Sequence, residues 1–134
     1  MAAVAAGQAT NSSAILDMSD YEGVLLIAKV GDVTSGSVMT LTAQQNIIDS
    51  VTGMATLSGS VTYTATSASD ADDDLLVLDI YRPQERYIRA QLVIGTQDAV
   101  ISGMIAIQYG CKKVPITQPA TVLDSDLLIS PSET

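Results

Sequence analysis

Turn-forming residues divide this sequence into short apolar runs of strand length, spaced roughly ten residues apart. The run Ser37–Gln45 shows the pattern clearly, because apolar Met39, Leu41 and Ala43 alternate with mainly polar neighbours. Such alternation places one set of side chains on each face of a strand. No segment has a convincing helical period, and Gln44–Val51 is the one candidate for a short helix. The predicted strands are Ala14–Met18, Glu22–Val30, Ser37–Gln45, Ala55–Thr66, Leu75–Tyr81, Tyr87–Ile94 and Ala99–Tyr109.

This pattern predicts an all-β fold, either a single antiparallel β-sandwich or a jelly-roll-like barrel of about seven strands. The 134 residues fit one domain. Its core has to be aliphatic, because the chain has no Phe or Trp and its five Tyr residues are the only aromatic ones. Aliphatic and β-branched side chains pack well on a pleated sheet, so the composition agrees with the strand pattern.

The composition also argues against several functional classes. The chain has no His, which is the commonest general base and metal ligand, and no recognisable pairing of a nucleophile with a base. We therefore expect no enzyme activity, no catalytic or metal-binding residue and no cofactor. A formal charge of −9 argues against nucleic acid as a partner. No apolar run approaches the ~20 residues that cross a bilayer, so we expect no membrane partner.

We expect an N-terminal extended arm at residues 1–13, a β-sandwich domain at 14–111 and an extended C-terminal arm at 112–134. The C-terminal part carries three of the four prolines, which cannot donate hydrogen bonds within a sheet. It also contains apolar residues, for which a solvated tail has little use. We expect this arm to lie on another surface, either of its own domain or, as we favour, of a neighbouring subunit. The residues expected to contact that neighbour are Leu123, Leu127, Leu128 and Ile129.

An acidic segment lies before the strand predicted at Leu75–Tyr81. Asp70, Asp72 and Asp74 have the spacing that begins a calcium-binding EF-hand loop. The motif then fails, because its sixth position is Leu75 instead of Gly and its twelfth is Tyr81 instead of Glu. We therefore favour a solvated acidic loop, and weak calcium binding stays open as an alternative.

Three of the six basic residues fall within RPQERYIR, residues 82–89. The segment RPQER connects two predicted strands, and its proline suits the second position of a turn. A hairpin of these strands would place apolar residues opposite one another on one face. It also predicts a cross-strand ion pair between Asp79 and Arg89. The predicted pairs are Tyr81 with Tyr87, Ile80 with Ile88, Leu78 with Ala90, Leu76 with Leu92, and Asp79 with Arg89.

The other two arginines, Arg82 and Arg86, lie in the connection itself. Only Glu85 is available locally as an acidic partner. Arginine beside tyrosine is common in protein interfaces, because the guanidinium both stacks and forms paired hydrogen bonds. We therefore favour a contact between subunits through Arg82 and Arg86, together with Tyr81 and Tyr87, over a solvated turn.

Several segments of the chain resemble a family of small structural proteins of tailed bacteriophages, encoded among the head genes. The resemblance lies in a strand ending in LDIYRP, the following RYIR strand and the strand ISGMIAIQYG. Segments near both ends of the chain also match, so the resemblance covers most of the sequence. The matching segments are ILDMSDYEGVLLIAKVG at 15–31, LTAQQ at 41–45, LLVLDIYRPQERYIRAQLVIG at 75–95, AVISGMIAIQYG at 99–110, KKVPIT at 112–117 and LISPSET at 128–134.

This resemblance implies a capsid decoration, or cement, protein. Such a protein would assemble in the host bacterial cytoplasm, bind the major capsid protein and stabilise the outer capsid surface of the virion. It would also bind itself, most simply as a homotrimer. Two other functions stay open: a structural component of the neck, head fibre or tail, and a β-sandwich module that binds carbohydrate or another ligand on the host surface.

Overall fold

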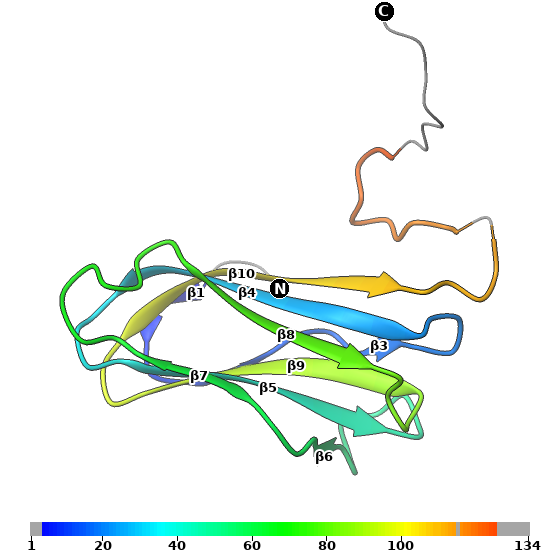
Figure 1. Ribbon diagram of the computed structural model, residues 1–134, viewed down its shortest axis with the longest axis horizontal. Helices are drawn as coiled ribbons and strands as arrows, with labels where there is room; N and C mark the ends of the chain where they lie inside the picture. The colour runs from blue at the N-terminus through cyan, green and yellow to red at the C-terminus, as the bar shows by residue number, and fades with distance from the viewer. Residues whose placement is uncertain (1–3, 115, 126–134) are drawn as a thin grey trace, which may run out of the picture.

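The computed structural model describes residues 4–114 and 116–125, which form ten β-strands and no helix (Figure 1). All strand pairs are antiparallel. This part of the chain therefore contains no helix long and apolar enough to cross a membrane. The strands are β1 (Val4–Gly7), β2 (Thr10–Ser12), β3 (Leu16–Asp17), β4 (Gly23–Val33), β5 (Val38–Asn46), β6 (Ala55–Thr56), β7 (Val61–Thr64), β8 (Leu75–Tyr81), β9 (Tyr87–Gly95) and β10 (Ala99–Tyr109).

The strands form two sheets that pack face to face as a sandwich (Figure 1). Sheet A has the order β1-β10-β4-β8. Sheet B has the order β2-β9-β5-β6, with β3 also paired to β9 and β7 also paired to β5. The predicted all-β fold is confirmed, and of its two forms the structure has the sandwich and not a closed barrel.

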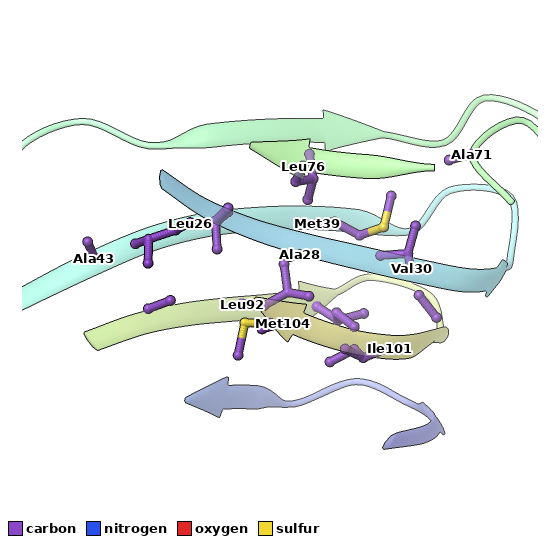
Figure 2. Packing of buried hydrophobic residues seen from close by; sticks show 14 of the residues in the cluster. Leu26, Ala28, Val30, Met39, Ala43, Ala71, Leu76, Leu92, Ile101 and Met104 are labelled. Carbon is purple, nitrogen blue, oxygen red and sulfur yellow. The ribbon is translucent and has the colours of Figure 1, made fainter. Parts of the chain in front are cut away.

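The core lies between the sheets and consists of aliphatic side chains and methionines (Figure 2). Met39, Leu41 and Ala43 of β5 are each at most 1% exposed, as their alternation predicted. They face Leu26 and Ala28 of β4, which are equally buried. The remaining buried apolar residues are Met18, Val24, Val30, Val33, Ala65, Ala71, Leu76, Ile88, Ala90, Leu92, Ile94, Ala99, Ile101 and Met104.

The short helix expected within Gln44–Val51 is absent, and this prediction was wrong. Strand β5 continues to Asn46, which is buried, with 5% of its surface exposed. Its amide nitrogen donates hydrogen bonds to the backbone carbonyls of Ser50 (2.8 Å) and Thr52 (3.0 Å). A side chain that bonds the backbone in this way competes with helical hydrogen bonds, and the chain forms a loop instead.

The hairpin expected between β8 and β9 is also absent. Strand β8 pairs with β4 in sheet A and β9 pairs with β5 in sheet B, so the connection 82–86 crosses from one sheet to the other. The predicted pairings of Tyr81 with Tyr87 and of Asp79 with Arg89 were therefore wrong. Alternation fixes which side chains of a strand face the core, and a sandwich satisfies it as well as a hairpin does.

The N-terminal segment, expected as an extended arm, is extended but paired with both sheets. Strand β1 pairs with β10 of sheet A, and β2 pairs with β9 of sheet B. The C-terminal segment behaves differently. Residues 116–125 form no strand, are exposed throughout and run away from the sandwich beyond β10 (Figure 1).

Candidate interaction surface

The outer face of sheet B is polar. On it, the hydroxyls of Thr40 and Thr62 lie 3.1 Å apart across neighbouring strands. The Arg89 Nε donates a 2.7 Å hydrogen bond to the side-chain oxygen of Gln44, whose own amide donates to Thr56 at 3.3 Å. Gln44 thus occupies the place that Asp79 was expected to take beside Arg89. Polar groups bonded to one another in this way suit a face that meets water.

The outer face of sheet A is apolar instead. The strand register places Ile105, Ile27 and Val77 side by side across β10, β4 and β8. The next outward-facing row contains Ile107, Leu25 and Asp79, and the row on the other side contains Lys29 and Leu75. The apolar residues are therefore contiguous but have one charged residue at each end. Ile105 is 65% exposed and Ile107 is 50% exposed. We call this surface the apolar face, and it consists of Leu25, Ile27, Leu75, Val77, Ile105 and Ile107.

The sequence contained a signal for this face that the strand prediction did not use. Residues 24–28 read VLLIA, and no polar residue interrupts them. A continuous apolar strand is typical of a sheet that is covered on both faces. In the described residues, one face of β4 packs on the core. The other belongs to the outer face of sheet A, where the neighbouring Ile105 of β10 and Val77 of β8 are exposed to solvent. The composition of β4 is therefore typical of a sheet whose outer face is covered by another surface.

A row of tyrosines ends the apolar face. Tyr109 and Tyr81 lie in register with Gly23, one on each side of it. The Tyr109 ring crosses the glycine, and its hydroxyl donates a 2.5 Å hydrogen bond to Asp79. This bond to a carboxylate raises the pKa of Tyr109 to about 12.

The connection 82–86, which we call the end loop, lines a pocket of about 380 Å³ at this end of the sandwich. Glu22 and Lys112, from outside the end loop, also line the pocket. Arg82, Arg86 and Lys112 are three of the six basic residues of the chain. The scarce positive charge is therefore gathered beside the tyrosine end of the apolar face.

The two arginines of the end loop differ in their partners. Arg82 has a left-handed backbone (φ 52°), and its guanidinium lies 5.1 Å from the centre of the Tyr81 ring. Within the part of the chain that the structure describes, Arg82 forms no ion pair. Arg86 forms two hydrogen bonds with the carboxylate of Asp17, at 2.9 and 2.8 Å, and stacks over Tyr87. Its acidic partner is 69 positions away in sequence, and no local pattern indicates this pairing.

The acidic segment uses its carboxylates within the fold. Asp70 accepts hydrogen bonds from the Tyr63 hydroxyl (2.7 Å) and from the backbone and hydroxyl of Thr66 (2.9 and 3.0 Å). Asp72 accepts a 2.8 Å hydrogen bond from the backbone of Val33. The described residues contain no group of three acidic, His or Cys side chains arranged to hold a metal ion.

Of the C-terminal residues expected to contact a neighbour, Leu123 is fully exposed, at 101%. The preceding Val122 is 40% exposed. Leu127, Leu128 and Ile129 lie outside the described residues. Leu123 thus has no apolar cover from its own sandwich, and whether it contacts a neighbour stays a prediction.

A scan against models of protein families found no match, and a search of the curated proteins found none either.

Proposed function

We propose that this chain is a structural virion protein of a tailed bacteriophage, which decorates the outer capsid surface as a homotrimer and binds the major capsid protein. The observation that carries the proposal is the apolar face. Monomeric proteins rarely expose a large contiguous apolar surface, and such surfaces mark sites of protein association. Ile105, Ile107, Leu75 and Val77 are each at least 43% exposed on one sheet.

The contrast between the sheets supports an association protein further. Sheet B carries hydrogen-bonded polar side chains on its outer face, such as Arg89 with Gln44, and suits contact with water. Sheet A does not. The sequence resemblance to small phage head proteins supports the capsid surface as the place where this association occurs.

Trimeric assembly suits the capsid role for a reason of affinity. A trimer that places three copies of one weak contact on a symmetric lattice gains about 10²–10⁴ in avidity without any new kind of contact. The net charge of −9 keeps free copies apart from nucleic acid and soluble before assembly.

The test is made on virions. We expect hundreds of copies per particle by quantitative gel densitometry, and antibody labelling on the outside of the head. We also expect particles lacking the protein to lose their DNA at a lower temperature or at low salt. A handful of copies per particle would favour the neck, head fibre or tail. Equal resistance of particles with and without the protein would contradict a stabilising role.

A further inference from the structure

The start of the C-terminal segment is anchored to the sandwich. Strand β10 ends at Tyr109, and Gly110 follows with a left-handed backbone (φ 64°). The backbone of Glu22 donates hydrogen bonds to the carbonyls of both residues (3.0 and 3.1 Å), and Lys112 donates one to Asp20 (2.8 Å). Beyond this anchor, residues 116–125 are exposed throughout and lie apart from the sandwich (Figure 1).

We propose that residues 116–125 of one copy lie along the apolar face of a second copy. This inference rests on the self-association in the proposed function and not on the capsid. Among the residues that the structure describes, two apolar surfaces are open to solvent, namely the apolar face and the pair Val122-Leu123. Because the segment lies apart from its own sandwich and is exposed throughout, we expect a neighbouring copy to supply the surface that it covers.

The segment is long enough for the apolar face. Ten extended residues reach about 33 Å, and the eleven residues of β10 span about 37 Å. The segment folds into a turn at 119–122, where the backbone of Val122 donates to the carbonyl of Pro119 (2.9 Å). Once extended, it is shorter than the whole of β10 but long enough to cover the rows that contain Ile105 and Ile107. Its Pro119 carries no backbone N–H, so one donor fewer is left without a partner when the segment lies on side chains instead of pairing with a strand.

The charges also match. Asp124 directly follows Val122 and Leu123, so the apolar pair is next to one carboxylate. On the receiving copy, Arg82 lies beside the tyrosine end of the apolar face and has no ion pair with any described residue. An apolar pair on the face would place Asp124 within reach of this cation, whereas the rest of the receiving molecule is predominantly acidic.

A mixing experiment with the full-length protein tests the exchange. The face variant is Ile105→Thr with Ile107→Thr, which keeps β-branched side chains in the strand. The segment variant is Val122→Ser with Leu123→Ser. We expect the wild type to sediment as an oligomer, and each variant alone to dissociate at least about tenfold more readily. An equimolar mixture should form a 1:1 complex, because one variant keeps the segment and the other keeps the face.

The control is Ile47→Thr, which alters an isoleucine that is 71% exposed in the loop after β5, away from the face. It should associate like the wild type, and circular dichroism should show the same fold for every variant. A mixture that stays monomeric, a segment variant that associates like the wild type, or a monomeric wild type would each overturn the exchange. None of these results changes the copy number in the virion, so failure here is distinguishable from failure of the capsid role.

Discussion

The Tyr109 hydroxyl reaches Asp79 from two strands away, with the whole of β4 between them. The Tyr109 ring can cross β4 because the residue beneath it is Gly23, which has no side chain. A methyl group added to Gly23 would overlap the ring of Tyr109. An aromatic side chain that covers a glycine on a neighbouring strand stabilises the sheet at that position. The position of Tyr109 at the end of the apolar face therefore depends on both Gly23 and Asp79.

The first prediction concerns the titration of Tyr109. The neutral phenol donates to the Asp79 carboxylate, which raises the pKa of Tyr109 to about 12. A raised pKa in the folded state means that this contact stabilises the fold below about pH 10, the usual tyrosine value, and that the contribution is lost as the pH rises through 12. Asp79→Asn should lower the pKa of Tyr109, as measured by ¹³C NMR of the tyrosine ring carbons. An unchanged value in the variant would show that the contact is absent in solution.

The second prediction concerns Gly23→Ala. The added methyl group should displace the Tyr109 ring, break its bond to Asp79 and lower the pKa of Tyr109 as Asp79→Asn does. The ring end of Tyr109 can swing outward, so the cost should be that of the lost hydrogen bond, roughly 0.5–1.5 kcal/mol of the free energy of unfolding, measured with urea. Gly95→Ala is the matched control, because nothing lies within 4 Å of a methyl group at Gly95. Equal effects of the two substitutions would contradict the predicted overlap with Tyr109.

For β8, which contains Asp79, the sequence predicted which side chains face the core but not which strand lies beside it. The alternation of β8 correctly predicted that Leu76, Leu78 and Ile80 face inward, since the first is buried and the others pack against the core. It also placed Asp79 outward. The partner strand could not be predicted, because the inward-facing residues of β4 are as apolar as those of β9. Pairing with β4 placed Asp79 beside Tyr109, a residue 30 positions later in sequence.

The candidate surface was predicted only in part, for a related reason. The basic cluster at the end loop was visible as a local excess of Arg82 and Arg86 in an acidic chain. The ion pair of Arg86 with Asp17 could not be predicted in the same way, because it depends on β3 lying beside β9. The apolar face likewise depends on which strands are neighbours. Individual exposed residues such as Ile105 become a surface only once β10, β4 and β8 are placed side by side.

The third prediction concerns the loop after β5. Asn46 holds this loop through hydrogen bonds from its amide to two backbone carbonyls and is only 5% exposed. Asn46→Ala should leave the carbonyls of Ser50 and Thr52 without this donor, at a cost of about 1–3 kcal/mol in the free energy of unfolding. Urea unfolding measures the change. Thr56→Ala, which removes one exposed side-chain hydrogen bond with Gln44, is the control and should change the stability much less. A stability of Asn46→Ala equal to that of the wild type would mean that the loop does not depend on this residue.

The fourth prediction concerns acid stability through Asp17. The two hydrogen bonds from Arg86 hold the pKa of Asp17 well below its usual range. A lowered pKa in the folded state means that the contact stabilises the fold above about pH 4, the unfolded value, and that this contribution declines as the pH falls further. Asp17→Asn keeps an oxygen for the backbone N–H of Ser19, which bonds Asp17 at 3.0 Å, but loses the charge. The variant should therefore unfold at lower urea than the wild type at pH 7.

The difference between Asp17→Asn and the wild type should shrink progressively from pH 4 to pH 3, because protonation of the unfolded wild type then removes the advantage of the ion pair. Arg86→Lys should behave like Asp17→Asn at pH 7, since an ammonium group cannot form the same paired hydrogen bonds. The control is Asp73→Asn, which breaks the exposed 3.0 Å pair with Lys29. Exposed single contacts contribute little, so this variant should match the wild type. A difference for Asp17→Asn that stays constant from pH 7 to pH 3 would show that charge is not what Asp17 contributes.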